Sequence, residues 1–387
     1  MMRRVYPINS LQSLQTPFYY YDVELLKDTL DCVNNEAKKY DNFFVHYAIK
    51  ANANPALLKI ISKAGLGADC VSGGEINIAC QTGFSPADIV FAGVGKSDWE
   101  INLALDKDIF CFNVESLAEL EVINMLAKDK NKVARVALRV NPDVDAHTHT
   151  NITTGLAENK FGISLSDIDD VVRTSMELDN IEFIGLHFHI GSQILDMSVF
   201  RTLCERINDI VSSFENVGIT IPNINVGGGL GIDYDNPEIN TIPDFRTYFK
   251  TYANFLKVSP KQKIHFELGR AIVGQCGTLI TKTLYIKKGT NKQFLIVDAG
   301  MTDLIRPALY QAYHKIENIS STKPNELYDV VGPICESSDV FGKNISLKGT
   351  MRNDLIAIKS AGAYGEIMAS QYNCRSLPKG YLSCDLI

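Results

Sequence analysis

Apolar residues follow a regular pattern through the middle of the chain, where short unbroken apolar runs alternate with longer segments of helical spacing. An unbroken run predicts a parallel strand buried on both faces, and helical spacing predicts an amphipathic helix packed against it. Between residues 23 and 272 this pattern predicts eight strands, which end near Lys50, Val71, Ala92, Asn113, Val140, His189, Gly227 and Leu268. Eight strand–helix units favour an α/β fold of the (β/α)8 TIM-like barrel type; the alternative is a doubly wound parallel sheet.

The predicted helices carry recognisable end signals. Asn54 suits the N-cap of the helix after the first strand, and Gly65 suits its left-handed C-terminal position. Ser97–Glu100 and Ser116–Glu119 have the residue types of a capping box, in which two side chains satisfy two open backbone N–H groups. The polar segment His147–Lys160 interrupts the pattern and is the candidate for a mobile loop.

The pattern changes after residue 272, where strands follow one another with few helical segments. The predicted strands are Thr278–Lys287, Phe294–Asp298, Leu327–Val331 and Asp354–Lys359. Runs of strands joined by turns are typical of an antiparallel sheet. We therefore expect a second domain of antiparallel all-β type, a β-sandwich or β-barrel-like domain, made of residues 273–387 together with residues 1–22, where Pro17–Tyr21 forms a further strand.

Composition narrows the class of protein. The 387 residues, of which 45% are hydrophobic, suffice for two domains with large cores. A net charge of -7 without a basic block argues against a nucleic-acid surface. No apolar run is long enough for a membrane span, and the N-terminus lacks the apolar core of a secretory signal. Nine scattered cysteines without a Cys-x-x-Cys pair favour a reduced, cytoplasmic protein with no metal site.

Lys50 ends the first predicted strand, and its position suggests chemistry. A lysine held at the end of a buried strand can lose its proton and attack a carbonyl, which makes it a candidate Schiff-base lysine. Taken alone, a lysine of this kind is more often a solvated charge at the end of a strand. In a barrel, however, the carboxyl ends of all strands converge on one mouth, where active sites are built.

Three further strand ends supply complementary groups. His187–Ser192 offers an imidazole that can lie flat against an aromatic cofactor, and Gly227–Gly229 offers backbone N–H groups for a phosphate. Glu267 can pair with a protonated ring nitrogen, while Gly269 and Arg270 add a backbone donor and a guanidinium. Taken singly, these residues can be a core histidine, a tight turn and an internal ion pair. Together with an amine they match the needs of pyridoxal 5'-phosphate.

At this point the chain resembles a known family. The motifs that carry the resemblance are Tyr47–Asn52, His187–Ser192, Gly227–Gly229 and Glu267–Arg270. They are similar to those of the barrel-type (fold type III) pyridoxal phosphate-dependent decarboxylases of basic amino acids. Within that family, Gly332–Asp339, Met301–Tyr310 and Gly362–Gly365 resemble the diaminopimelate decarboxylases. The resemblance covers nearly the whole chain, with its motifs in the same order.

The resemblance implies a set of cofactor-binding roles. Lys50 would form the Schiff base, His189 would stack on the ring, and Glu267 would pair with the ring nitrogen. The cofactor phosphate would be held by Ser192, Gly227, Gly228, Gly229, Gly269 and Arg270. Tyr364 would lie near cofactor and substrate. Leu268 stands where the family usually has a proline, and this difference affects backbone stiffness rather than a functional group.

The resemblance also implies substrate-binding roles and a partner. Arg270, Arg306 and Tyr310 would bind the distal carboxylate of the substrate, and Glu336 its distal ammonium group. Cys335 would donate the proton that replaces the lost carboxylate. In this family the segment with Cys335 and Glu336 reaches the active site of the partner subunit, so the resemblance implies an obligate homodimer with shared active sites.

The implied reaction is decarboxylation of meso-2,6-diaminopimelate to L-lysine and CO2. A decarboxylase of ornithine, arginine or carboxynorspermidine is an alternative on the same fold, although Arg306 with Glu336 disfavours the first two. An alanine-type racemase normally sets an arginine against the ring nitrogen, which Glu267 opposes. A non-catalytic pyridoxal phosphate-binding homologue is the alternative from a different class, and the presence of both Lys50 and Cys335 opposes it.

Overall fold

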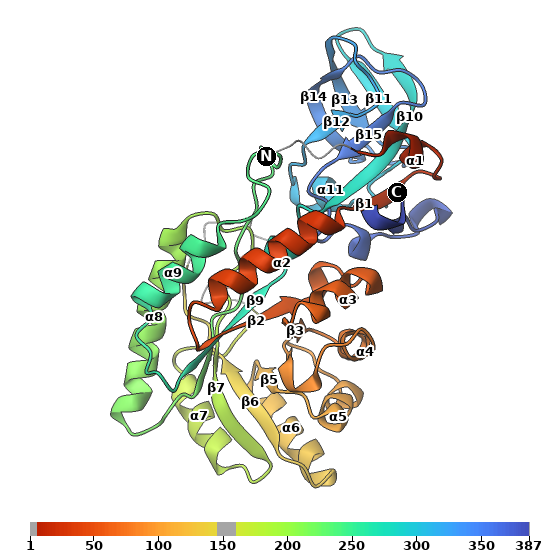
Figure 1. The fold of residues 1–387 in the computed structure, drawn as a ribbon. Helices are drawn as coiled ribbons and strands as arrows, with labels where there is room; N and C mark the ends of the chain where they lie inside the picture. The colour runs from red at the N-terminus through yellow and green to blue at the C-terminus, as the bar shows by residue number, and fades with distance from the viewer. Residues whose placement is uncertain (1–5, 145–159, 387) are drawn as a thin grey trace. The chain divides into compact units, whose positions relative to one another are not determined.

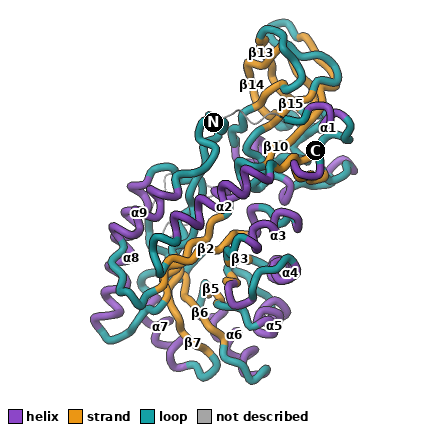
Figure 2. The backbone as a smooth tube through the Cα atoms, viewed as in Figure 1, coloured by secondary structure: helices purple, strands orange, loops and turns teal. Residues whose placement is uncertain are grey.

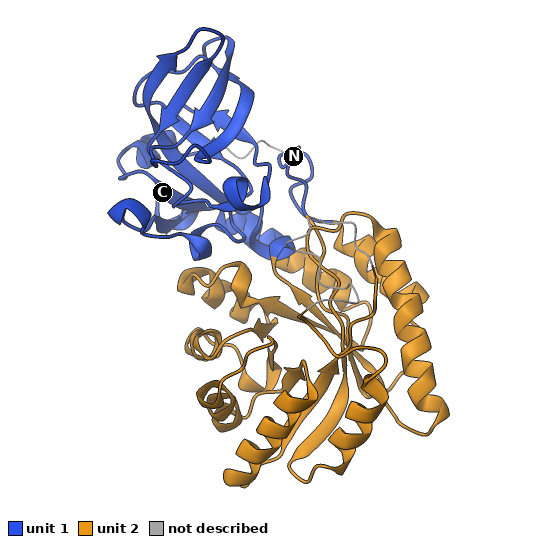
Figure 3. Ribbon diagram, turned by 180° about the vertical axis from the view of Figure 1, so that it is seen from behind, with its two compact units in different colours: residues 1–29, 232–243, 270–387 blue, residues 30–231, 244–269 orange. Residues whose placement is uncertain are grey.

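A computed structural model describes residues 6–144 and 160–386 of the chain (Figures 1 and 2). Except for Lys160, the predicted mobile segment His147–Lys160 lies outside the described residues. The chain divides into two compact units (Figure 3). The first comprises residues 1–29, 232–243 and 270–387, and the second comprises residues 30–231 and 244–269.

The second unit is a closed barrel of eight strands in chain order. The strands are β2 (Phe43–Ala48), β3 (Gly67–Cys70), β4 (Ile89–Phe91), β5 (Cys111–Val114), β6 (Ala134–Arg139), β7 (Ile181–His187), β8 (Asn223–Asn225) and β9 (Lys263–Leu268). All neighbours pair in parallel, and β9 closes the barrel by pairing with β2, where Val45 lies opposite Phe266. The predicted barrel of eight strands is confirmed, and the doubly wound alternative is wrong.

Helices surround these strands (Figure 2). The longer ones are α2 (Val23–Ala37), α3 (Pro55–Lys63), α4 (Gly73–Gln81), α5 (Asp98–Lys107), α6 (Leu117–Asp129), α7 (Ile168–Glu177), α8 (Met197–Asn216) and α9 (Phe245–Phe255). Two predicted end signals are confirmed, since Asn54 accepts the Ala56 N–H and Ser97 takes part in a complete capping box. At α6, Ser116 accepts the Glu119 N–H as predicted, but the Glu119 carboxylate bonds to other residues.

Aromatic packing holds α9 against the barrel. Phe266 of β9 is fully buried, and its ring centroid lies 5.0 Å from that of Phe249 and 5.1 Å from that of Tyr252. Buried aromatic side chains contribute large apolar areas and favour such edge-to-face contacts. This packing fixes strand β9, whose next residue, Glu267, points to the opposite side, toward the barrel interior.

The first unit contains a sheet whose main path runs β12-β15-β10-β11-β13-β14, with β1 paired to β10 and β16 paired to β1. Its strands are β1 (Phe18–Tyr21), β10 (Gly277–Lys288), β11 (Gln293–Val297), β12 (Ile316–Asn318), β13 (Asn325–Val331), β14 (Val340–Lys348), β15 (Leu355–Ile358) and β16 (Lys379–Leu382). The predicted strand near Tyr19 joins this sheet as expected. The sheet is mostly antiparallel rather than wholly so, because the pairs β1–β16 and β11–β13 are parallel.

Sequence reasoning missed three strands of this sheet. β12 is only three residues long, and β14 and β16 are largely half-buried or exposed, so neither shows an unbroken apolar run. Short helical elements are also present: α1 (Ile8–Gln12), α10 (Arg270–Val273), α11 (Arg306–Tyr310), η1 (Ile49–Ala51), η2 (Pro86–Asp88), η4 (Glu366–Met368), η5 (Tyr372–Cys374) and η6 (Ser383–Asp385). Within the described part of the chain, no helix has the length and apolar character needed to cross a membrane.

Candidate active site

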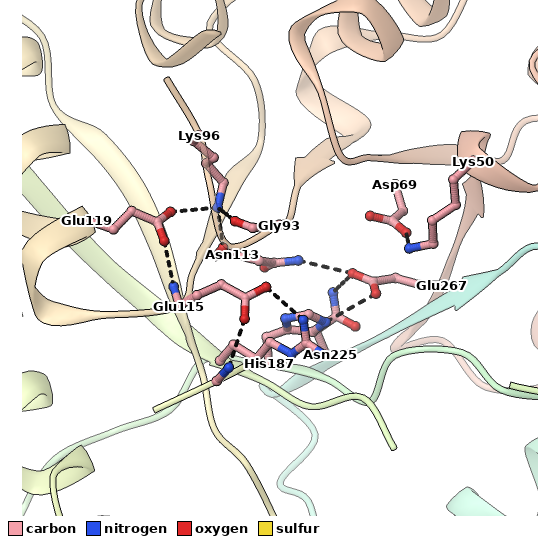
Figure 4. A network of polar contacts seen from close by, with 12 residues as sticks. Lys50, Asp69, Gly93, Lys96, Asn113, Glu115, Glu119, His187, Asn225 and Glu267 are labelled. Carbon is pink, nitrogen blue, oxygen red and sulfur yellow. Dashed lines mark hydrogen bonds and ion pairs between the residues drawn. The ribbon is translucent and has the colours of Figure 1, made fainter. Parts of the chain in front are cut away.

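Lys50 lies at the carboxyl end of β2, in the short helical turn η1. Its Nζ donates to Asp69 Oδ2 of β3 at 2.9 Å (Figure 4). The Asp69 side chain is fully buried, whereas the Lys50 side chain is about one-third exposed. The lysine therefore reaches from a buried strand end to a partly open position, with a carboxylate beneath it to orient its amine.

Glu267 of β9 is the centre of a second set of contacts (Figure 4). Its Oε1 accepts from the side-chain amides of Asn113 at 3.0 Å and Asn225 at 2.8 Å. Its Oε2 lies 3.1 Å from His187 Nε2. Burial alone would raise the pKa of Glu267, but His187, together with Lys50 and His189, outweighs burial and holds this pKa well below its usual range. The buried carboxylate is therefore anionic.

The pKa of Asp69 is shifted in the opposite direction to that of Glu267. Burial, and after it the nearby Glu267 charge, raise the pKa of Asp69, while Lys50 opposes the shift. The other carboxylate oxygen, Asp69 Oδ1, is buried without a hydrogen-bond partner among the described residues, as is His187 Nδ1. Buried polar atoms usually have partners, so the position of Asp69 Oδ1 is suited to a polar ligand.

His189 and the three glycines lie beyond the ends of β7 and β8. The Gly228 N–H donates to His189 Nδ1 at 3.2 Å, which leaves the imidazole proton on Nε2. Burial lowers the pKa of His189 well below its usual value, so the ring is a neutral, flat surface. The Gly227 N–H donates to Asn225 Oδ1 at 2.9 Å. Ser192 lies half-buried in the segment after β7.

Close backbone approach requires glycine at two of these positions. A Cβ on Gly228 would lie 2.0 Å from the Glu267 carbonyl oxygen, and Gly227 has a left-handed φ of +70°. A Cβ on Gly269 would lie 3.0 Å from the Ala51 side chain. The ends of β8 and β9 therefore come together with no room for side chains at these positions.

A buried network of charges links the ends of β4, β5 and β6 (Figure 4). Lys96 Nζ donates to Glu119 Oε1 at 2.6 Å and to the backbone carbonyls of Gly93 and Asn113, both at 2.8 Å. Arg139 pairs with Glu115 at 2.7 Å in the same way. Sequence reasoning missed this network. The capping-box pattern at Glu119 was a misleading signal, because its carboxylate instead pairs with Lys96 and accepts the Glu115 N–H.

Replacing Lys96 with methionine is expected to lower the free energy of unfolding by about 3–5 kcal/mol. The Lys96 side chain is 1% exposed, so its loss leaves the buried Glu119 carboxylate and two carbonyls without their donor. Urea denaturation measures the change. The matched control is Lys130→Met, which removes an exposed pair with Asp106 and is expected to cost about 1 kcal/mol or less. Equal losses in the two variants would contradict a structural role for the buried pair.

The first unit contains a separate cluster of buried cations and aromatic rings. Arg270 Nη1 donates to the Tyr234 hydroxyl at 2.6 Å, and its guanidinium lies 5.0 Å from the centre of the Tyr364 ring. The Arg306 guanidinium lies 5.1 Å from the centre of the Tyr234 ring. Its Nη1 donates to His314 Nε2 at 2.8 Å. Two guanidinium groups thus share one tyrosine, although both side chains are about 95% buried.

The charge of Arg306 lacks full compensation in this cluster. Its Nε has no hydrogen-bond partner among the described residues. His314 cannot compensate the charge, because burial and the neighbouring Arg306 lower the pKa of His314 to about 3 and its Nδ1 bonds to the Lys359 carbonyl. A buried cation without a carboxylate partner is costly, so the cluster is suited to an anionic ligand.

Of the remaining predicted residues, Tyr310 belongs to the same short helix as Arg306, whereas Cys335 and Glu336 lie apart from the cluster. Tyr310 ends α11 and is half-buried. Cys335 and Glu336 are exposed, and the Tyr372 hydroxyl donates to Glu336 Oε1 at 2.9 Å. The described contacts of Cys335 and Glu336 include none of the other predicted site residues. Within one subunit the structure therefore does not assemble them with the arginine cluster.

A cavity of about 980 Å³ in the first unit is not the candidate site. None of the predicted site residues lines it. Four of its charged side chains pair with one another, since Lys359 pairs with Glu317 at 2.8 Å and Lys315 pairs with Glu238. The groups capable of chemistry lie instead at the barrel mouth and in the arginine cluster.

Comparison with known proteins identifies the family. A sequence profile described as "Pyridoxal-dependent decarboxylase, pyridoxal binding domain" matches residues 28–274. The chain belongs to the pyridoxal-dependent decarboxylases. Two of its relatives are called diaminopimelate decarboxylase. The protein from Bacteroides thetaiotaomicron is 64% identical over 100% of both chains. The protein from Aquifex aeolicus is 41% identical over 94% of this chain and 86% of its own.

Solved decarboxylase structures agree with the fold. Diaminopimelate decarboxylase from Helicobacter pylori, complexed with L-lysine, is 40% identical and has a TM-score of 0.91 over 97% of this chain and 93% of its own. The arginine decarboxylase of Paramecium bursaria Chlorella virus has a TM-score of 0.84 over 97% of this chain and 99% of its own, but at 21% identity it supports the fold alone.

The residues at the barrel mouth fit the pyridoxal phosphate of this decarboxylase family. Lys50 supplies an amine, His189 a neutral flat ring, and Glu267 a buried anion for a protonated ring nitrogen. The buried, partnerless Asp69 Oδ1 leaves a polar position for a ligand, whereas the N–H groups of Gly227 and Gly228 already donate to Asn225 and His189. The cofactor prediction is confirmed by the family match.

Several contributors to the barrel mouth of the second unit, and to the arginine cluster of the first, were absent from the predicted site residues. They are Asp69, Asn113, His187, Asn225, Tyr234 and His314. Asn113 and Asn225 stand at strand ends, which a barrel brings together, so their positions were a usable signal. Tyr234 and His314 lie far apart in the sequence in segments without a motif, so no local signal marked them.

Proposed function

We propose that this chain catalyses the pyridoxal phosphate-dependent decarboxylation of meso-2,6-diaminopimelate to L-lysine and CO2, the last step of lysine biosynthesis. Its full-length relatives called diaminopimelate decarboxylase, and the Helicobacter pylori structure complexed with L-lysine, support this proposal. The observation in the structure that carries it is the pair of buried guanidiniums, Arg270 and Arg306, around Tyr234.

The arginine pair supports a substrate with a distal carboxylate. Arg270 and Arg306 suit such a group because guanidinium donors match carboxylate geometry, and Tyr310 contributes from the end of α11. Glu336 is the proposed partner of the distal ammonium group. Ornithine, arginine and lysine carry a cation at this end, and for them two buried arginines would be repulsive. A diamine-forming decarboxylase is therefore disfavoured.

Each cofactor-binding residue has a proposed task. When bound, pyridoxal phosphate accepts the electrons that the departing CO2 leaves behind. Lys50 would hold the cofactor covalently, and Asp69 would orient the lysine amine. His189 would offer its flat ring to the cofactor ring, and Glu267 would pair with a protonated ring nitrogen. The proposed phosphate ligands are Ser192, Gly227, Gly228, Gly229, Gly269 and Arg270, with Tyr364 beside Arg270.

Cys335 is the proposed donor of the proton that takes the place of CO2 on the substrate carbon. Its exposure in the first unit, and that of Glu336, supports a role in a partner subunit's site, so we propose a homodimer with shared active sites.

The proposed location is the cytoplasm. All nine cysteines of the chain are free in the structure, which supports a reducing compartment.

A CO2-release assay with four substrates tests the function. We expect turnover of meso-diaminopimelate, and turnover at least about 100-fold lower with lysine, ornithine or arginine, because these lack the distal carboxylate. Arg306→Met is expected to reduce kcat/KM for meso-diaminopimelate by about 100-fold, mainly through KM, while cofactor binding stays unchanged. Preferred turnover of ornithine or arginine by the unmodified protein would overturn the proposal.

A further inference from the structure

The carboxylate of Glu267 is held by donors from three different strands. Asn113 of β5 and Asn225 of β8 donate to Oε1, and His187 of β7 approaches Oε2 at 3.1 Å (Figure 4). Among these described donors, the two amides are neutral at every pH, and His187 is the member whose side chain can carry positive charge. Each carboxylate oxygen therefore has its own hydrogen-bond donors, and the described side-chain donor to Oε2 is His187.

The side chain of His187 has no other hydrogen bond among the described contacts. Its side chain is 1% exposed, and its second nitrogen, Nδ1, is buried without a hydrogen-bond partner. A buried imidazole with one unused nitrogen is costly to keep in a strand that could carry an apolar residue. The interaction that offsets this cost is the one with Glu267, for which His187 Nε2 must carry a hydrogen.

The second histidine of the same motif has different contacts. His189 Nδ1 accepts the Gly228 N–H at 3.2 Å and has no described hydrogen bond to Glu267. Burial and nearby positive groups lower the pKa of His189, whereas His187 is among the groups that lower the pKa of Glu267. His189 is therefore the proposed partner of the cofactor ring, whereas His187 contacts the Glu267 carboxylate.

We propose that His187 is a positioning residue for Glu267, holding its Oε2 in place and keeping the carboxylate ionised so that it can pair with the protonated ring nitrogen of the cofactor. This inference rests on the proposed function. His187 touches neither the substrate nor the cofactor in this scheme, and it acts through Glu267 alone. Loss of His187 should therefore slow the chemical step and not substrate binding. The ring nitrogen has to accept more electron density only in the chemical step.

The test compares two substitutions of His187. His187→Phe retains a flat ring but removes the donor, whereas His187→Gln places an amide N–H near the former Nε2 position. For His187→Phe we expect kcat to fall by about 10–100-fold, the scale of a hydrogen bond to a charged group, with KM changed by less than about twofold. His187→Gln is expected to recover most of the loss.

A spectroscopic measurement separates this role from simple packing. With ¹⁵N-labelled pyridoxal phosphate, the ring-nitrogen chemical shift of the His187→Phe protein should move toward the unprotonated value at neutral pH, and that of His187→Gln should not. The matched control is His265→Gln, which alters an equally buried barrel histidine of β9 that bonds to His46 and Asn223 rather than to Glu267. The control is expected to leave the ring-nitrogen shift unchanged.

The outcomes distinguish this inference from the proposed function. If the unmodified protein fails to bind the labelled cofactor, the proposed function is wrong. If it binds the cofactor and releases CO2, but His187→Phe retains a protonated ring nitrogen and unchanged kcat, then the positioning role alone is wrong. Should His187→Phe fold poorly, His187→Met takes its place as the variant without a donor to Glu267, and a loss of kcat in it no larger than that of His265→Gln would show a packing effect.

Discussion

Replacing Lys50 with alanine is expected to abolish covalent attachment of the cofactor and to lower CO2 release from meso-diaminopimelate by about 10⁴-fold or more. This is the scale of loss when an enzyme is deprived of its covalent nucleophile. The lysine lies at the end of β2 with its Nζ 2.9 Å from a fully buried aspartate, so no other amine shares its position among the described contacts. The checks are intact mass after borohydride reduction and single-turnover CO2 release.

Lys63→Ala is the matched control for this prediction. Lys63 is an exposed lysine in the last turn of α3, downstream of the same strand. Its replacement should leave both the added cofactor mass and the rate unchanged. If the Lys50→Ala protein kept both full turnover and the added cofactor mass, Lys50 would not be the attachment residue. If it kept full turnover but lost the cofactor mass, covalent attachment would not be required for the reaction.

Replacing Cys335 with alanine is expected to reduce kcat by about 10²–10⁴-fold, the range attributed to general acid–base catalysis. The cofactor should still attach to Lys50, because Cys335 is exposed and none of its described contacts involves the barrel mouth. The measurement is steady-state turnover with cofactor occupancy determined in parallel. The matched control is Cys374→Ala, an exposed cysteine with no proposed role, which should retain normal turnover.

Mixing Lys50→Ala and Cys335→Ala subunits tests whether the sites are shared. In a homodimer with shared sites, random reassortment makes half of the dimers mixed, and each mixed dimer has one site free of both changes. About a quarter of all active sites are then unaltered, so the mixture should recover about a quarter of normal activity. If each subunit forms a complete site alone, the mixture should be as inactive as its two components.

Much of the barrel followed from local pattern. The strand ends predicted near Lys50, Asn113 and Leu268 agree with β2, β5 and β9, because a strand buried on both faces is mostly apolar along its length. The sheet of the first unit was harder to predict. The parallel pairs β1–β16 and β11–β13 join segments distant in sequence, and nothing in a single strand specifies its partner.

The sequence by itself therefore determined the barrel, the strand ends that bear Lys50, His189 and Glu267, and the chemistry of the cofactor. Only the tertiary structure decided which side chains meet across strands. Barrel closure brings His187, on β7, to Glu267, on β9, and folding of the first unit joins the distant Arg306 and His314 to Tyr234. The physical reason is that hydrophobic periodicity specifies the burial of each element, whereas hydrogen bonds between elements depend on register and packing.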